Sequence, residues 1–293
     1  MTDYKYVTYE TLEGGTIARI MLNRPESRNA QSRGLLVELD QAMLEAEADD
    51  QVRVVILGGH GTMFSSGHDM GSKLAVAERS PGPDQHPSVV INGGTREGAE
   101  KRMLQEWHYF YQNTLRWRNL RKPTIAAIQG YCIFAGWAIA SACDLIFAAD
   151  DAMFLPANFQ YFSVPWDLGS RKAKEVLFES RFLSAQEVLD LGFVNRVIPR
   201  ANLDAEVMAY AGRVAENDPF QLWMTKKAIN QAEDAQGFTA HIHDAFNLHM
   251  MSSIGEGDPD YALRKPEGQR RRPMVQRAME NYEHYRQSGQ AQQ

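Results

Sequence analysis

The sequence predicts an α/β protein whose C-terminal part is mainly helical. Three observations predict it. Two short apolar runs, at residues 52–57 and 124–129, have the composition of buried parallel strands. Each run is followed by a loop of small residues and then by a helical pattern. Beyond residue 200 the pattern is almost entirely helical. This order predicts strand–helix–strand units with right-handed crossovers.

The N-terminal region predicts a hairpin followed by a helix. Residues 5–12 and 16–22 alternate in polarity around Gly14-Gly15, as the two strands of a hairpin do. Ser32 is a plausible N-cap for a helix over residues 33–48. The helix would present one apolar face, made by Leu35, Leu36, Leu39, Met43 and Ala46.

The middle of the chain predicts further strands and helices around one long loop. Residues 72–98 are polar and rich in Pro, Gly and Ser, which predicts a loop or lid. Helices are expected over residues 99–118 and 137–142, and strands over 145–148 and 194–198. Residues 130–136 are expected to form a loop. The polar tail after Tyr285 is expected to be frayed.

Composition limits the class of partner. The chain has 293 residues, enough for one large domain, and a net charge of −6, which argues against nucleic acid as the main ligand. A local basic patch could still hold phosphates. The first residues contain no apolar signal segment, and polar residues break the apolar stretch 124–149. We therefore expect a cytoplasmic protein that does not span a membrane, with Cys132 and Cys143 reduced.

Two loops have the features of an oxyanion hole. Residues 64–70 and 130–137 each follow a buried strand and place small residues ahead of an apparent helix. Small residues let a ligand approach the backbone, and helix starts leave free N–H donors. Two such donors aimed at one point can stabilise an oxyanion. Glycine-containing turns after strands are common, so this pattern alone leaves a purely structural role open.

Five segments resemble the crotonase, or enoyl-CoA hydratase/isomerase, superfamily. They are IARIMLNRPESRNA, VRVVILGGHGTMFSSGHDM, KPTIAAIQGYCIFAGWAIASACDLIFAADDAMF, FLSAQEVLDLGFVNRVIP and TKKAIN. The resemblance implies a crotonase-like spiral of repeated ββα units over residues 1–200. Residues 201–293 would then form a helical region that serves trimerisation and the acyl-CoA pocket. It also implies an acyl-CoA substrate and a homotrimer or dimer of trimers.

The resemblance assigns roles to individual residues. The backbone N–H groups of His68 and Ala135 fall at the two oxyanion-hole positions. Ala135 lies within Phe134-Ala135-Gly136, where the family has three glycines. Coenzyme A would enter as part of the substrate, with no separate cofactor and no metal. The positions expected to bind it are Arg28, Ala30, Ser66, Asp69 and Lys226.

The sequence departs from the family at the acid/base positions. The two family glutamates fall on Ala138 and Asn158, and neither side chain transfers protons as a carboxylate does. The two-glutamate mechanism therefore cannot operate unchanged. Asp167 lies one residue from a position that carries a catalytic aspartate in some family members, so we expect it to be the replacement. The alternative for Asp167 is a helix N-cap. The His68 imidazole is a second titratable candidate.

These residues predict an enoyl-CoA hydratase-like lyase that stabilises a thioester enolate without either usual glutamate. One alternative is a C–C bond hydrolase, retro-aldol lyase or isomerase that acts on a bulky acyl-CoA. Another is a catalytically silent CoA-binding protein. The suggestion of a bulky acyl group rests on aromatic residues expected near the pocket, namely Phe134, Trp137, Phe159, Tyr161, Phe162 and Trp166.

Overall fold

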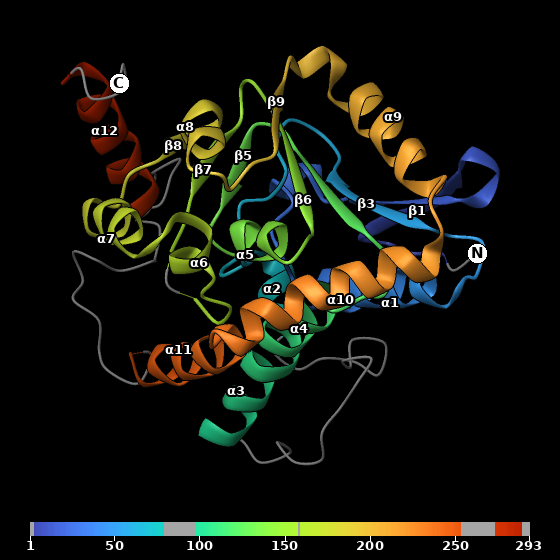
Figure 1. Cartoon of the computed structure of the whole chain (residues 1–293). Coiled ribbons are helices and arrows are strands. Elements are labelled where there is room, and N and C mark those ends of the chain that lie inside the picture. Colours follow the sequence, from blue (N-terminus) through green and yellow to red (C-terminus); the bar gives the residue numbers. More distant parts are fainter. Residues whose placement is uncertain (1–2, 79–97, 158, 253–272, 289–293) are drawn as a thin grey trace.

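The structure is a computed structural model that describes residues 3–78, 98–157, 159–252 and 273–288 (Figure 1). Within these residues the strands form two sheets. The six-stranded sheet has the order β1 (Val7–Leu12), β2 (Ile17–Leu22), β3 (Val54–Gly59), β4 (Thr124–Ile128), β6 (Leu145–Ala149) and β9 (Arg196–Ile198). The three-stranded sheet has the order β5 (Tyr131–Ile133), β7 (Met153–Leu155) and β8 (Leu183–Ser184).

The predicted hairpin and parallel strands are confirmed. β1 and β2 pair antiparallel, with Val7 opposite Leu22, around a 3₁₀ turn, η1 (Glu13–Gly15). The pairs from β2 through β3, β4 and β6 to β9 are all parallel. The strand predicted at 52–57 begins two residues later, at Val54, because its register is set by pairing with β2.

Strand pairs that alternate between the two sheets form ββα units. β4 belongs to the large sheet and β5 to the small one, and α5 (Ala135–Ser141) follows them. β6 and β7 repeat this division and precede α6 (Val164–Leu168) and α7 (Ser170–Glu179). The prediction of a loop over 130–136 is wrong at residues 131–133, which form β5, and at 135–136, where α5 already begins. Residues 131–133 pair with β7, a contact that a run too short to show periodicity cannot reveal.

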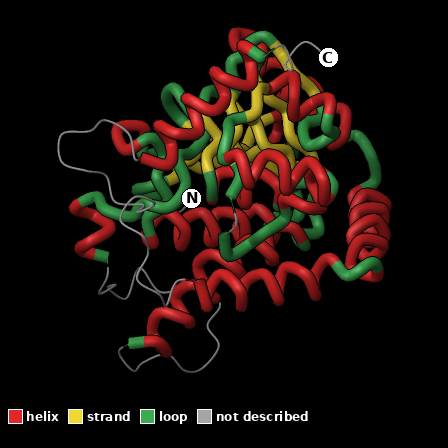
Figure 2. Tube along the Cα trace, turned by 90° about the vertical axis from the view of Figure 1, so that its left-hand side faces the viewer, coloured by secondary structure: helices red, strands yellow, loops and turns green. Residues whose placement is uncertain are grey.

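Alternation along the large sheet decides which helix covers each face. Ile17, Val54 and Ile125 pack in one apolar cluster with α9 (Leu203–Ala215). Their neighbours in sequence belong to another cluster that includes α1 (Arg33–Ala48). Side chains along a strand point to opposite faces in turn, so both faces of this sheet are buried. Figure 2 shows the strands enclosed by helices.

The first helix matches its prediction at both ends. α1 covers Arg33–Ala48, and the Ser32 hydroxyl accepts a hydrogen bond from the Leu35 N–H at 3.3 Å. The prediction of a loop over 72–98 is wrong at its start, where Lys73–Ala77 forms α2 behind the N-cap Ser72. A serine hydroxyl that satisfies a free N–H supports even so short a helix. Residues 79–97 lie outside the described part of the chain.

The helix predicted over 99–118 forms with a widened middle. It consists of α3 (Ala99–Gln105), a π-helical segment η4 (Glu106–Gln112) and α4 (Asn113–Arg118). A π-helical segment is rare and often marks a functional site. The remaining helical elements are η2 (Pro25–Ser27), α8 (Ala185–Asp190), η5 (Arg200–Asn202), α10 (Pro219–Ala235), α11 (Phe238–Ser252) and α12 (Pro273–Gln287).

The C-terminal helices pack on the core. α10 is joined to α4 by the Arg118–Glu233 ion pair at 2.8 Å, and Figure 1 shows the two helices side by side. α12 packs through Ala278 against Phe182. The helical C-terminal region is thus confirmed, while its boundary at residue 200 stays a prediction. Both cysteines are free thiols. In the described ranges no helix has the length and apolarity needed to cross a membrane.

Candidate active site

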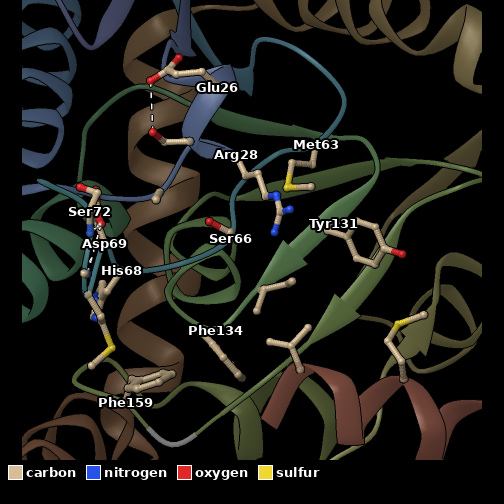
Figure 3. Close-up of a pocket in the computed structure, with 17 residues that line it drawn as sticks. Glu26, Arg28, Met63, Ser66, His68, Asp69, Ser72, Tyr131, Phe134 and Phe159 are labelled. Carbon is tan, nitrogen blue, oxygen red and sulfur yellow. Dashed lines mark hydrogen bonds between the residues drawn. The ribbon is translucent and has the colours of Figure 1, made fainter. Parts of the chain in front are cut away.

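A pocket of about 620 Å³ collects most of the residues that the sequence assigned to coenzyme A (Figure 3). Arg28, Ala30, Ser66, His68 and Asp69 all line it. In Figure 3, Arg28 and Ser66 face the middle of the pocket, and α12 borders one side. The other lining residues are Glu26, Ser27, Met63, Met70, Gly71, Ser72, Tyr131, Ile133, Phe134, Phe159, Val275 and Met279.

The turn at Arg28-Asn29 is fixed by the backbone around it. Both residues adopt positive φ, 59° and 51°. The buried Asn29 amide holds the turn, since its Nδ2 donates to the His60 and Met63 carbonyls at 2.9 Å. The Ser66 N–H then donates to the Arg28 carbonyl at 3.0 Å. Two segments nearly 40 residues apart therefore form one rigid rim that carries the exposed Arg28 guanidinium.

Asp69 is an anchor for this rim. Its carboxylate pairs with Arg24 at 2.9 Å, and both side chains are about 95% buried. It also accepts a hydrogen bond from the hydroxyl of Ser72, the N-cap of α2, and so holds the start of that helix. Burial alone would raise the pKa of Asp69, but the hydrogen bonds from Ser72 and Arg24 lower it overall. The carboxylate therefore stays charged at neutral pH.

The two loops predicted to form the oxyanion hole meet at Gly67. This residue has φ +82°, and a Cβ built on it would lie 2.8 Å from the Ile133 carbonyl oxygen and 3.2 Å from the Ala135 nitrogen. Only glycine fits so close an approach. His68 follows Gly67 directly, so its backbone lies beside that of Ala135. The predicted donors are thus brought together from segments 67 residues apart in the chain.

Phe134 keeps a conformation that usually needs glycine. Its φ is +55° at the N-cap of α5, and its N–H donates to the Leu155 carbonyl at 2.8 Å. A non-glycine residue in this region stores strain of about 1–3 kcal/mol, which is typical of functional sites. Phe134 therefore holds a backbone conformation that glycine adopts more readily, at a position where the resemblance to the family predicts glycine.

A small cavity lies directly behind the hole. His68, Ala135 and Ala138 line it together with Gln160 and Tyr161. Its volume is about 10 Å³, the size that one water occupies. Ala138 therefore faces the hole from the position where the family resemblance places a glutamate.

The His68 imidazole is uncharged at neutral pH. Its ring lies 3.9 Å from the Phe110 ring and 5.7 Å from the Phe159 ring, measured between centroids. Burial among these groups, with a smaller contribution from nearby His249, lowers the pKa of His68 to about 3. The ring can therefore serve as a neutral wall of the pocket, and it carries no positive charge toward a thioester.

Asp167 occupies a position that does not match the predicted acid/base role. It lies within α6, so it is not an N-cap either. Its carboxylate accepts hydrogen bonds from the Trp137 indole at 2.7 Å, the Ser141 hydroxyl at 2.9 Å and the Ser163 hydroxyl at 2.7 Å. It lines none of the pockets described here. Burial raises its pKa, and the three hydrogen bonds partly offset that effect.

Lys226 also lies away from the predicted contact. Its ammonium pairs with Asp144 at 2.8 Å and donates to the Lys122 carbonyl at 3.1 Å, which ties α10 to the start of β6. The TKKAIN match suggested a contact between Lys226 and coenzyme A. A match in sequence does not reveal which face of α10 the side chain occupies. Asn158 lies outside the described residues.

The aromatic residues expected around the acyl group divide into two sets. Phe134 and Phe159 line the main pocket, and Tyr161 lines the small cavity. Trp137 instead stacks on Phe193 at 3.8 Å in the core, and the Trp166 indole donates to the His241 ring at 3.0 Å. Phe162 packs at that same His241 ring, with the two centroids 5.9 Å apart. Of the six aromatic residues expected near the pocket, three therefore line a cavity and three pack elsewhere.

A second pocket, of about 310 Å³, opens on the other side of His68. It shares His68, Asp69, Met70 and Phe159 with the first pocket. Its polar lining includes Glu106, Gln160 and His249, which sequence reasoning did not select. Glu106 stands in a run of aromatic residues with no motif around it, so no sequence signal marks it. No group of three or more His, Cys, Asp or Glu side chains that could hold a metal occurs within the described ranges.

Known proteins are similar to this chain in both sequence and fold. The family model for enoyl-CoA hydratase/isomerase matches residues 13–88 and 91–257. A candidate enoyl-CoA hydratase of Mycobacterium tuberculosis, EchA13, is 45% identical over 264 residues, or 87% of this chain and 83% of that protein.

Two solved structures extend the comparison. A probable enoyl-CoA hydratase from Mycobacterium smegmatis superimposes with a TM-score of 0.73 at 40% identity, covering 84% of this chain and 93% of that one. An enoyl-CoA hydratase/isomerase from Xanthobacter autotrophicus gives 0.72 at 33% identity, covering 88% and 90%. Together with the ββα units and the meeting of the two loops, these matches show that the chain belongs to the enoyl-CoA hydratase/isomerase family, with the crotonase fold.

Proposed function

We propose that this protein is an enoyl-CoA hydratase-like lyase that binds an acyl-CoA thioester and stabilises its enolate with the backbone N–H groups of His68 and Ala135. The observation that carries the proposal is the contact at Gly67, where the two loops pass so closely that a Cβ built on Gly67 would lie 3.2 Å from the Ala135 nitrogen. Backbone donors held in this way need no reorganisation as charge develops on the thioester oxygen.

The binding half of the proposal rests on the rim of the larger pocket. Coenzyme A carries phosphates, and the exposed Arg28 guanidinium offers charged donors to them. The backbone at Ala30 and the Ser66 side chain border the same space. The acyl chain would then pass His68 into the second pocket. No separate cofactor is needed, since the thioester carbonyl itself accepts the electrons.

A second candidate is cleavage of a bulky acyl-CoA by C–C hydrolysis or a retro-aldol step, with isomerisation as a related outcome. Ala138 favours it, because an alanine at this place leaves space behind the hole and removes a proton carrier. Both reactions need the same enolate-stabilising hole. A catalytically silent CoA-binding protein would also keep the rim and the hole.

A turnover screen by mass spectrometry separates these functions. The panel contains straight-chain 2-enoyl-CoAs, aromatic acyl-CoAs and cyclic β-keto acyl-CoAs. A gain of one water on enoyl substrates is the expected result for the proposed lyase. Cleavage of a β-oxygenated or cyclic substrate, without hydration of any enoyl-CoA, would replace the hydratase with the second candidate. Binding of every panel member without product would identify a silent protein.

We also propose a homotrimer or a dimer of trimers in the cytoplasm. The support is apolar exposure on the C-terminal helices, where Phe220, Ile229 and Leu248 are each more than half exposed. Exposed groups of large apolar side chains often mark an interface. Light scattering after gel filtration should give three or six times the mass of the chain, and a monomer at micromolar concentration would contradict it.

A further inference from the structure

The second pocket contains a carboxylate whose surroundings suit proton transfer. Glu106 is half-buried at the start of the π-helical segment η4 and lines this pocket together with His68, Phe159 and Gln160. The Gln160 side-chain amide donates a hydrogen bond to it. Gln160 is 4% exposed and also lines the small cavity behind the hole. One hydrogen bond therefore connects Glu106 to the space around Ala135.

The same segment, η4, also packs against His68 of the predicted oxyanion hole. Phe110, four residues after Glu106, lines both the second pocket and the small cavity, and its ring lies 3.9 Å from the His68 ring. π-Helical segments are energetically unfavourable and recur at functional sites. Here the segment presents a carboxylate and the aromatic ring that contacts His68 to one pocket.

The surroundings of Glu106 raise the pKa of its carboxyl group. Burial raises the pKa of Glu106, while the Gln160 hydrogen bond and the charges of Arg102 and Arg33 act in the opposite direction with smaller effect. A raised carboxyl pKa brings an acid/base group closer to neutral pH, where it exchanges protons most efficiently. The titratable and charged groups that share this pocket are Arg33, His68, Asp69, Glu78, Arg102 and His249.

The other carboxylates in this region already bind structural partners. Asp69 is paired with Arg24, and Glu78 accepts hydrogen bonds from the Arg33 and Gly34 N–H groups at the start of α1. Asp167 accepts three hydrogen bonds in the core. Each of these groups holds a piece of backbone or a helix in place. Glu106 differs because it accepts a hydrogen bond from the Gln160 side-chain amide inside the pocket.

We propose that Glu106 is the acid/base group of this enzyme, oriented by Gln160, and that it takes over the task of the two glutamates replaced by Ala138 and Asn158. This inference rests on the proposed lyase function. It moves the proton carrier from the loops that form the hole to the helix formed by α3, η4 and α4.

The chemical step balances with this single carboxylate. The water oxygen bonds to C3 of the enoyl thioester while one water proton passes to Glu106. The electron pair of the C2–C3 double bond moves toward the carbonyl, and the negative charge on its oxygen is held by the His68 and Ala135 N–H groups. Protonated Glu106 then returns the proton to C2, which gives a 3-hydroxyacyl thioester and regenerates the carboxylate.

Exchange of C2 protons in D₂O tests the proposal together with hydration. Butyryl-CoA serves as the exchange probe and crotonyl-CoA as the hydration probe, with wild type, Glu106→Gln and Glu106→Asp compared. We expect Glu106→Gln to slow both reactions by about 10²–10⁴-fold, the range for loss of a general acid/base, with unchanged CoA affinity. Glu106→Asp should recover part of the rate. Glu100→Gln, the same change on the same helix outside both pockets, should stay within about twofold of wild type.

The pH profile adds a readout that a structural role would not move. The base form of Glu106 is ionised, so wild-type exchange should rise with pH above the ordinary glutamate value of 4.5, and the residual exchange of Glu106→Gln should lack that rise. Wild-type rates in folded Glu106→Gln would overturn this inference alone. A wild-type protein that binds CoA yet neither exchanges nor hydrates would overturn the lyase function and Glu106 with it.

Discussion

Two sides of the space around His68 are built from different chemical groups. The oxyanion wall, made of Gly67, His68, Phe134 and Ala135, offers backbone N–H groups. The helix wall, made of Glu106 and Phe110 with Gln160 beside them, offers side chains. A backbone group survives a change of side chain as long as the chain keeps its path. A side-chain group is lost with a single substitution.

This difference decides what a substitution would change on each side. On the oxyanion wall, Phe134 adopts φ +55°, a backbone conformation that usually needs glycine. On the helix wall, a substitution of Glu106 would remove the carboxylate itself, whatever path the backbone takes. The oxyanion wall is therefore sensitive to backbone geometry and the helix wall to side-chain chemistry.

The loss of kcat expected for Gly67→Ala is second only to that expected for Glu106→Gln. The new Cβ would lie 2.8 Å from the Ile133 carbonyl oxygen at φ +82°, so one of the two loops must move. Loss of an oxyanion donor lowers kcat by about 10²–10³-fold. Gly212→Ala in α9 is the control, because nothing lies within 4 Å of its Cβ position. Steady-state rates at matched folded fractions measure the effect. A Gly67→Ala protein with wild-type kcat would show that the oxyanion wall does not depend on this contact.

A smaller effect on stability should follow Asp167→Asn. The amide can accept only part of the three hydrogen bonds from Trp137, Ser141 and Ser163, and leaving buried donors unpaired costs about 1–3 kcal/mol. Two of these donors lie on α5, so the change should loosen the helix that starts at Ala135. Urea unfolding measures the cost. A loss of kcat matching that of Glu106→Gln, in a stable protein, would instead restore Asp167 as the acid/base group.

The pH dependence of stability in Asp167→Asn tests which protonation state of Asp167 the folded protein prefers. Burial raises the folded pKa of Asp167 above its unfolded value. The stability that this group contributes is therefore full below the unfolded value and is lost as pH rises through the folded one. The difference in unfolding free energy between wild type and Asp167→Asn should shrink over that window. A difference that grows with pH would mean that the folded protein prefers the ionised carboxylate.

The smallest effect should come from Arg28→Ala on the rim. Its guanidinium is exposed, so a contact with a CoA phosphate is screened by water. We expect KM for acyl-CoA to rise by about 3–10-fold with little change in kcat, and to depend less on salt than in wild type. Lysine at this position should recover part of the affinity, since it keeps the charge and loses the forked donors. Equal KM values for wild type and Arg28→Ala would remove Arg28 from the CoA site.

Elements that depend on local pattern could be predicted from the sequence. The α1 helix behind Ser32, the N-terminal hairpin and the buried strands β3, β4 and β6 follow from periodicity and capping, which neighbouring residues fix. Family similarity singled out the loop around Gly67 and the Arg28-Asn29 turn, whose positive φ values leave a sequence signature. Their roles in an oxyanion hole and in binding coenzyme A stay predictions.

The positions of the acid/base and lysine side chains depend on packing between distant elements. A charge one residue from a known position suggested Asp167, but the direction of α6 turns its carboxylate toward Trp137 and the core. Lys226 likewise points from α10 toward Asp144, next to the start of β6. Glu106 reaches the pocket only because η4 packs on His68 through Phe110, some 40 residues away in the chain. Side-chain chemistry depends on which face a helix buries, and that is set by packing between elements distant in sequence.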